Sequence, residues 1–210
     1  MTTQDLSPIG TGVSVTASPN VVWHESAVGH GQRPMPSGPG MTVWLTGLSG
    51  SGKSTIAVEL ERQLVAAGRA AYVLDGDNLR HGLNADLGFS VEDRAENVRR
   101  LAEVAKLLAD SGQVVVVAAV SPQRAARDVA RRAHESAGIR FVEVFVDTPL
   151  EECEARDPKR LYARARTGAV ADFTGVSAPY EPPIDPELTL QTTEGGVQES
   201  VQLLLELIRG

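Results

Sequence analysis

The chain has 210 residues, of which 42% are hydrophobic and 22% charged; this balance excludes wholesale disorder and fits one domain of ordinary size. The formal net charge of −7 argues against general nucleic-acid binding, so any anionic ligand must be held by a local cluster of basic side chains. The single cysteine, Cys153, excludes an internal disulfide framework and favours a reducing compartment. We expect neither a signal peptide nor a membrane span, because the opening MTTQDLSPIG lacks the charge pattern of a leader and every apolar run is short.

The sequence pattern changes at about residue 40. Residues 1–40 are rich in Gly, Pro, Ser and Thr without a helical period, which predicts a flexible N-terminal extension. Residues 41–210 alternate between strand and helix patterns. Such alternation predicts a single α/β domain with a mainly parallel sheet.

In chain order, the predicted elements are a strand at 41–46, a helix at 53–67, a strand at 69–74, a helix at 90–110, a strand at 113–120, a helix opened by Ser121-Pro122, a strand at 140–147, a helix opened by Thr148-Pro149, a strand at 187–193 and a helix at 196–209. Ser90 and Asp93 have the spacing of a capping box. Ser121 and Thr148 are expected N-caps of the helices that follow them. Arginines within 124–132 are expected on a solvated helix face.

One stretch, residues 157–183, breaks the alternation. It reads DPKRLYARARTGAVADFTGVSAPYEPP and is long, basic and punctuated by glycine and proline. A loop of this length inside a compact domain is either a functional lid or a disordered segment.

The stretch GLSGSGKS at 47–54 matches G-x-x-x-x-G-K-[ST] at every fixed position, directly after a predicted strand and at the start of a helix. Glycines let backbone N–H groups curve around phosphate oxygens, and the helix N-terminus adds positive potential. Lys53 would face the β- and γ-phosphates, and the Ser54 hydroxyl can ligate Mg²⁺. The alternative is a glycine-rich turn that binds nothing, and motif and context together disfavour it. The predicted nucleotide-binding residues are Gly47, Leu48, Ser49, Gly50, Ser51, Gly52, Lys53, Ser54 and Thr55.

Many P-loop proteins carry a metal-binding aspartate at the end of the third strand, and this sequence lacks one there. The third predicted strand ends in AAVSP, without an aspartate, and the guanine-reading sequence N-K-x-D is absent. Asp75, at the end of the second predicted strand, is the candidate. By analogy of fold, this arrangement is typical of small-molecule kinases.

Polar side chains gather where an acceptor would bind. Ligands of open α/β sheets lie at the carboxyl ends of the strands. Arg80 and Arg94 together predict an acceptor that bears phosphate or sulfate, because arginine forks match tetrahedral oxyanions; alternatively, they only pair with Asp93 or Glu96. Phe89 is either a core residue or a stacking surface for a base. The candidate acceptor residues are Asp75, Asp77, Asn78, Arg80, Arg94 and Asn97.

Several of these segments resemble the adenylylsulfate (APS) kinase family: GLSGSGKST, DGDNLRHGLNADLGFSVEDRAENVRR, VSP at 120–122, DPKRLYARARTG and FTGVSAPYEPP. NVVWHESAV at 20–28 resembles the family's N-terminal lead-in, and the likeness continues to the C-terminus. The family transfers the γ-phosphate of MgATP to the 3′-hydroxyl of adenosine 5′-phosphosulfate, giving PAPS. The resemblance therefore implies a nucleotide-kinase-like P-loop fold with parallel strands flanked by helices and a mobile lid at about 157–183. It also implies ATP and Mg²⁺ as cofactors and no nucleic-acid or membrane partner. A cytoplasmic homodimer, with a possible functional association with a sulfate adenylyltransferase, is expected too.

The resemblance also implies roles for individual residues. Phe89 and Phe173 would sandwich the adenine of APS. Asp75 would orient the 3′-hydroxyl or share the metal with Ser54, and Lys53 would assist catalysis. In some members of the family the serine that matches Ser121 has been considered a phosphorylated intermediate, whereas an N-cap hydroxyl favours direct transfer. The implied APS contacts are Asp77, Asn78, Leu79, Arg80, Arg94, Asn97, Val120, Ser121 and Lys159.

The chain departs from the family pattern within the lid, and other functions stay open. Arg160 stands where the family usually has glycine, and YARAR replaces YKKAR. One alternative is a kinase for another small anionic alcohol, such as a sugar acid, which the pair Phe89 and Phe173 disfavours. The other is an inactive nucleotide-binding partner of a sulfate-activating complex, which the intact Lys53 and Asp75 disfavour. His24, His30, His81 and His134 lack metal-ligand spacing and are expected to be surface or packing residues.

Overall fold

The sheet has five parallel strands in the order β2-β3-β1-β4-β5. This computed structural model describes residues 38–157, 159–170, 172–193 and 195–210, so the predicted extension at 1–40 lies almost wholly outside the described residues. The parallel sheet confirms the predicted fold class. The strands are β1 Met41–Thr46, β2 Ala71–Asp75, β3 Val114–Ala118, β4 Arg140–Asp147 and β5 Leu188–Gln191.

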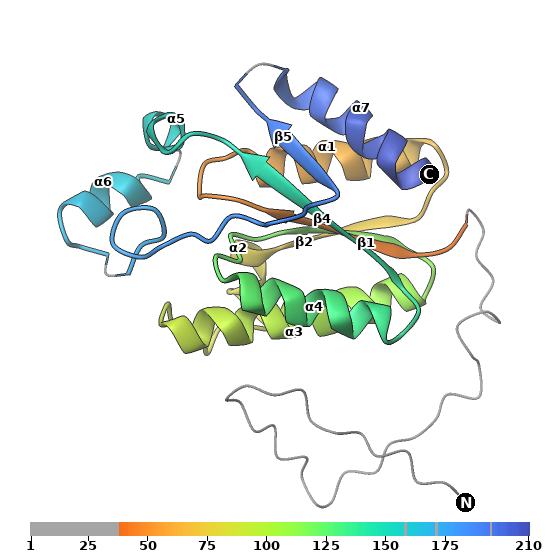
Figure 1. Cartoon of the computed structure of the whole chain (residues 1–210), viewed down its shortest axis with the longest axis horizontal. Helices are drawn as coiled ribbons and strands as arrows, with labels where there is room; N and C mark the ends of the chain where they lie inside the picture. The colour runs from red at the N-terminus through yellow and green to blue at the C-terminus, as the bar shows by residue number, and fades with distance from the viewer. Residues whose placement is uncertain (1–37, 158, 171, 194) are drawn as a thin grey trace, which may run out of the picture.

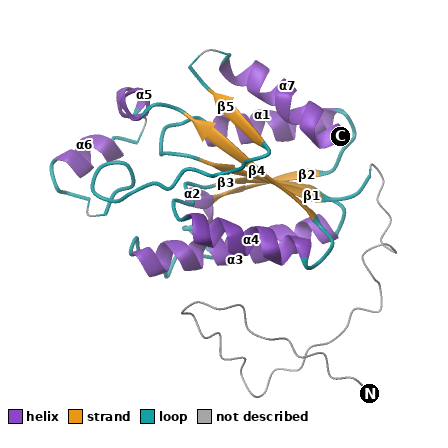
Figure 2. Ribbon diagram, viewed as in Figure 1, coloured by secondary structure: helices purple, strands orange, loops and turns teal. Residues whose placement is uncertain are grey.

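Helices cover both faces of this sheet. Helices α1 and α7 lie on one face, and α3 and α4 lie on the other, whereas α5 and α6 lie beyond the arrowheads of β4 and β5 (Figures 1 and 2). Within the described residues, no helix combines the length and apolarity needed to cross a bilayer. The helices are α1 Lys53–Ala66, α2 Gly76–Leu79, α3 Val91–Asp110, α4 Arg124–Glu135, α5 Leu150–Arg156, α6 Leu161–Arg166 and α7 Gly196–Arg209.

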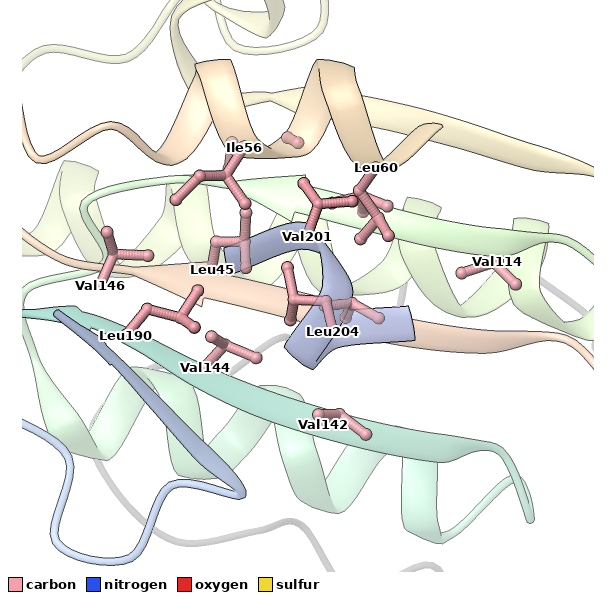
Figure 3. Close-up of a cluster of buried hydrophobic side chains, with 14 of the residues drawn as sticks. Leu45, Ile56, Leu60, Val114, Val142, Val144, Val146, Leu190, Val201 and Leu204 are labelled. Carbon is pink, nitrogen blue, oxygen red and sulfur yellow. The ribbon is translucent and has the colours of Figure 1, made fainter. Parts of the chain in front are cut away.

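The central strands are apolar on both faces, and successive residues feed two separate cores. Leu45 of β1 packs with Ile56 and Leu204 of the covering helices on one side (Figure 3). Its neighbour Trp44 packs with Leu101 on the opposite side. Side chains alternate across a strand, so a sheet buried on both faces requires this continuous apolar sequence.

The strand order places β1 beside β3, and the connections that follow these two strands run to opposite faces: α1 follows β1 on one face and α4 follows β3 on the other. Because all strands are parallel, their carboxyl ends meet at one edge, from Asp75 of β2 to Gln191 of β5. The switch in direction beside β1 opens a crevice there, where open α/β sheets bind ligands. The loop that follows β1 therefore enters this crevice.

The start of α3 agrees only partly with the prediction. The hydroxyl of Ser90 accepts a hydrogen bond from the backbone N–H of Asp93 at 3.1 Å, which confirms the N-cap. The carboxylate of Asp93 does not close the box: it accepts instead from the backbone N–H of Gly88 at 3.1 Å. Asp93 thus fixes the turn before the helix.

Two predicted N-caps are wrong. Helix α4 begins at Arg124 with Gln123 as its N-cap, and α5 begins at Leu150 with Pro149 as its N-cap. The hydroxyl of Thr148 donates instead to the carbonyl of Ser51 at 3.0 Å. The hydroxyl of Ser121 is engaged with β1, as described below. In both cases a partner distant in sequence replaces the local cap.

Candidate active site

A cavity of about 1260 Å³ lies at the carboxyl edge of the sheet. This volume exceeds the range of about 300–1,000 Å³ that is typical of a single small-molecule pocket, so two substrates can share it. It brings together the loop after β1, the end of β2, the start of α3, the corner after β3 and the segment 157–183. Of the predicted acceptor residues, the lining includes Asp75, Asp77, Asn78, Arg80, Phe89, Arg94, Asn97, Val120, Ser121, Lys159 and Phe173.

The glycine-rich loop after β1 has the backbone of a phosphate cradle. Gly50 and Gly52 have φ values of 77° and 102°, in the left-handed region that favours glycine. A side chain at Gly50 would also place its Cβ 2.9 Å from the carbonyl oxygen of Cys153. The loop leads directly into the N-terminus of α1, whose first N–H groups have no partner within the helix. An anion is the natural partner of such a terminus.

Lys53 is buried inside this loop. Its ammonium group donates hydrogen bonds to the carbonyl of Leu48 at 2.6 Å and to the hydroxyl of Ser51 at 3.3 Å. Burial lowers its pKa from 10.5 to about 8, although the nearby carboxylates of Asp75 and Asp77 favour the charged form. The amine is therefore poorly compensated in the free protein, and phosphate oxygens would supply the missing negative charge.

Ser54 and Asp75 meet at the start of the cradle. The Ser54 hydroxyl donates to Oδ2 of Asp75 at 2.7 Å. The other oxygen, Oδ1, accepts from the backbone N–H groups of Asp77 at 2.9 Å and Asn78 at 3.2 Å, which caps α2. The cap fixes the carboxylate so that one oxygen faces the P-loop. The hydrogen bonds of the cap thus explain the orientation of the Asp75 carboxylate.

Hydroxyl and carboxylate oxygens are hard donors that suit Mg²⁺, which usually takes one or two protein ligands and completes its shell with water and substrate phosphates. Ser54 and Asp75 fit that requirement. Among the described residues, no group of three or more His, Cys, Asp or Glu side chains is arranged to hold a metal by itself. The pair Ser54 and Asp75 suits a metal that takes its other ligands from water and substrate phosphates.

Arg80 and Arg94 do not pair with Asp93 or Glu96. Arg80 donates through a single nitrogen to the carbonyls of Leu87 at 3.0 Å and Gly88 at 2.9 Å, and its guanidinium lies 4.3 Å from the centre of the Phe89 ring. Partial burial lowers its pKa from the usual arginine value, while Asp77 and Asp93 oppose the shift. Arg80 also lines the cavity.

Arg94 is held differently. Its Nε donates to the carbonyl of Phe89 at 2.8 Å, and its two terminal nitrogens donate to the Thr174 hydroxyl and the Asp172 carbonyl. Arg94 thus ties the Phe89 turn to the segment 157–183. To contact an acceptor anion as well, it must share or release these bonds.

Asn97 has a buried partner that the sequence did not reveal. The amide nitrogen of Asn84 donates to Oδ1 of Asn97 at 3.0 Å. With its oxygen so engaged, the amide nitrogen of Asn97 is left as a donor beside the cavity. Asn84 therefore sets which end of the Asn97 amide a ligand meets.

Ser121 is buried, and its hydroxyl belongs to a hydrogen-bond chain with β1. Its Oγ accepts from the indole N–H of Trp44 at 3.1 Å and donates to the Thr46 hydroxyl at 3.0 Å. The Thr46 hydroxyl donates in turn to the Val120 carbonyl at 2.8 Å. Ser121 also has a φ of 40°, in the left-handed region. The chain of bonds holds the Val120-Ser121 corner against the end of β1.

The segment 157–183 is not one long loop: it contains helix α6 and docks over the P-loop. Tyr162 of α6 donates its phenolic hydrogen to the Ser49 carbonyl at 2.9 Å and contacts the Phe173 ring edge-on at 5.0 Å. Lys159 forms an ion pair with Asp77. Arg160 has a φ of 54°, a conformation in which glycine is more comfortable. That explains why glycine suits this position.

Sequence reasoning missed part of the cavity wall. These missed residues lie after the carboxyl end of β5, at the start of α7, at the end of α5, within α6 and in the segment that follows α6. The rule that ligands bind at the carboxyl ends of strands, applied to the fifth strand, would have found Thr192. Among the missed lining residues are Arg156, Leu161, Arg164, Val170, Thr174, Thr192, Gly196, Val197 and Ser200.

The expected solvated face of α4 is wrong for one arginine. Arg127 is only 1% exposed. His134, from the same helix, is buried as a packing residue: its ring nitrogens bond the Thr42 hydroxyl and the Ala130 carbonyl at 2.9 and 2.8 Å. Burial lowers its pKa.

A parallel sheet, a complete P-loop beside a carboxylate and an acceptor cavity that opens from it define a P-loop kinase of the small-molecule type. The adenylylsulphate kinase family profile matches residues 39–191. The chain belongs to the adenylylsulphate kinase family.

Named relatives and a solved structure are similar to this chain over most of its length. The chain is 50% identical over 189 residues to the adenylyl-sulfate kinase of Saccharomyces cerevisiae, covering 90% of this chain and 94% of that protein. It is 56% identical over 193 residues to the bifunctional enzyme CysN/CysC of Mycobacterium tuberculosis, with 92% of this chain but only 31% of that enzyme covered. The solved structure of the Mycobacterium tuberculosis APS kinase CysC in complex with AMPPNP and APS superposes with a TM-score of 0.80 at 56% identity, covering 82% of this chain and 99% of that one.

Proposed function

We propose that this chain transfers the γ-phosphate of ATP to the 3′-hydroxyl of adenosine 5′-phosphosulfate. The observation that carries the proposal is one continuous cavity that joins the cradle of Lys53, Ser54 and Asp75 to an arginine- and phenylalanine-lined end, in a chain of this family. Adenylyl-sulfate kinases are relatives over most of their own length, which supports the same acceptor here.

The donor occupies the P-loop side. The backbone N–H groups of the loop and the N-terminus of α1 bind its phosphates, and the phosphate charge compensates the buried ammonium of Lys53. Ser54 and Asp75 would hold Mg²⁺, which would neutralise charge on the phosphate oxygens. Arg156 and Thr192, which also line the cavity, would then lie on the side of the nucleotide base.

The acceptor occupies the opposite side. Phe89, more than half exposed, offers a ring face for the adenine, and Phe173 lines the same cavity. Arg80 and the amide nitrogen of Asn97 supply donors for the phosphosulfate and its nucleoside. Lys159, now paired with Asp77, is close enough to exchange that carboxylate for a substrate anion.

Transfer in this site is direct. Phosphoryl transfer depends mainly on alignment and charge stabilisation, so a protein that positions donor and acceptor in one cavity needs no covalent relay. Ser121 is a poor relay, because its hydroxyl already bonds Trp44 and Thr46. Asp75 accepts from Ser54 of the cradle and caps α2, and from this position it would hold the metal and face the acceptor hydroxyl.

ADP release, measured with MgATP and one acceptor at a time, tests the proposal. We expect ADP only when APS is present, and loss of that activity in Lys53→Met. Equal release with gluconate or adenosine monophosphate would identify a kinase for another acceptor. Absence of release with every acceptor, despite nucleotide binding, would identify a non-catalytic binding protein.

A homodimer in the cytoplasm and a functional link to a sulfate adenylyltransferase are further parts of the proposal. The bifunctional relative supports the link, because it carries about two thirds of its length outside the matched region. Light scattering of the purified chain tests the dimer: a monomer at micromolar concentration would contradict it.

A further inference from the structure

Arg127 is a buried arginine outside the cavity, on the inner face of α4. Its three nitrogens each donate to a different segment: Nε to the Glu143 carboxylate at 2.6 Å, one terminal nitrogen to the Ser121 carbonyl at 2.7 Å and the other to the Glu181 carbonyl at 2.8 Å. A buried charge that reaches three segments this closely is costly to place. Its two main-chain contacts have no role in pairing the Glu143 charge.

Both carbonyls belong to segments that border the active site. Ser121 forms the corner that lines the cavity and has a φ of 40°. Such a conformation persists only where the surroundings fix it. Arg127, on α4, holds this corner by donating to the Ser121 carbonyl.

Glu181 lies where the segment 157–183 returns to the body of the protein. Its backbone N–H donates to the Pro122 carbonyl at 2.9 Å, and its carboxylate accepts from the Arg124 backbone N–H at 2.8 Å. The preceding Tyr180 bonds Thr46 at 2.9 Å. The base of the segment and the Ser121 corner are therefore one hydrogen-bonded unit, with Arg127 at its centre.

We propose that Arg127 is a positioning residue for the acceptor: it holds the Val120-Ser121 corner and the base of the 157–183 segment in the arrangement that binds APS. It contacts neither substrate and acts through the main chain of those two segments. The inference rests on the proposed function, because it names the determinant of one half of that site. The P-loop is bound by other contacts, so the donor nucleotide does not depend on Arg127.

The neighbouring charges allow a test that separates positioning from stability. Glu143 is the acidic partner, and the Arg131 guanidinium lies 3.6 Å from the same carboxylate. Arg127→Met leaves that buried carboxylate poorly paired and is expected to destabilise the fold. The double variant Arg127→Met/Glu143→Leu removes both charges, which is often neutral or stabilising in a core. Arg127→Lys keeps a positive charge beside Glu143 but cannot reach both carbonyls.

The experiment measures KM for APS at saturating ATP, KM for ATP at saturating APS, and the thermal midpoint of each variant. We expect the double variant and Arg127→Lys to raise KM for APS by about tenfold or more, because small displacements of positioning groups have effects of that size. KM for ATP should stay within about threefold, even where the double variant recovers the thermal midpoint.

Arg131→Met is the matched control, since it removes an arginine from the same helix and the same ion-pair group but leaves the bonds of Arg127 in place. It should leave both KM values unchanged. Wild-type KM for APS in Arg127→Lys, or equal rises in both KM values, would overturn the inference. Failure of the proposed function is distinguishable, because the wild-type protein itself would then show no APS-dependent ADP release.

Discussion

Replacing Lys53 with methionine should stabilise the free protein at neutral pH while it abolishes phosphoryl transfer. Burial lowers the pKa of Lys53 from 10.5 to about 8. One pKa unit corresponds to about 1.4 kcal/mol, so holding this charged amine in the fold costs roughly 3 kcal/mol at pH 7. Methionine has a similar length and no charge. The variant also loses the two hydrogen bonds that Lys53 donates to Leu48 and Ser51. Each lost bond reduces the gain in stability by about 1 kcal/mol. The expected net gain is about 1 kcal/mol.

The pH dependence follows from the two protonation states. In the unfolded chain the lysine keeps its proton up to about pH 10.5, whereas in the folded protein it loses it above about pH 8. Between these values the unfolded state binds more protons, so the stability of the wild-type protein rises with pH relative to the variant. From pH 7 to pH 9.5 the relative gain is about 2 kcal/mol.

Urea unfolding at both pH values, on wild type and Lys53→Met, measures this gain. The comparison cancels the titration of every other group, since both proteins share it. Lys106→Met controls for the loss of a lysine elsewhere, because Lys106 lies on α3 and pairs with Glu103. If the difference in unfolding free energy between wild type and Lys53→Met stays constant from pH 7 to pH 9.5, the reasoning is refuted. The pKa of the Lys53 amine would then not be lowered by burial.

Three further predictions concern the segment over the site and the corner beside it. Limited proteolysis should cut the free protein near Arg164 or Arg166 and be slowed by nucleotide plus APS; unchanged cleavage would argue against a closing lid. Arg160→Val should lose about 1–2 kcal/mol of unfolding free energy, because a β-branched residue is strained at a φ of 54°, whereas Arg160→Gly should change it less; equal losses would contradict the assigned strain. Ser121→Ala should lose about 1–2 kcal/mol, since the buried Trp44 N–H loses its acceptor, and should keep substantial kinase activity; complete loss of activity with phosphate trapped on Ser121 in the wild type would show a covalent route.

The sheet and the phosphate cradle could be predicted because residues close together in the sequence determine both. The strand at 140–147 and the helix at 196–209 have the predicted bounds, since a β-branched run and an apolar helical stripe mark them. The third strand was predicted as 113–120 but ends at Ala118, because the corner after it turns away to bond Thr46 of β1. Boundaries move where a tertiary contact ends the pairing.

The arginines of α4 show what the sequence could not reveal. Helical periodicity alone does not tell which of these arginines faces the core. Charged residues usually face solvent, so all of them were expected to be exposed. Arg127 faces inward because its three acceptors come from Ser121, Glu143 and Glu181, which the fold brings together from separate parts of the chain. Asn84 escaped notice for the same reason: its partner Asn97 lies on the next helix.

The predicted role of Ser121 was argued from a helix cap that the structure does not contain. The sequence predicted a helix cap, and from it a hydroxyl too occupied to act as a nucleophile. The cap does not exist, yet the hydroxyl is occupied all the same, by Trp44, Thr46 and the Ala119 carbonyl. None of these partners is a base that could remove its proton, and activation of a serine requires one. We therefore expect the corner to serve the reaction through its shape, and the Ser121 side chain to contribute to stability.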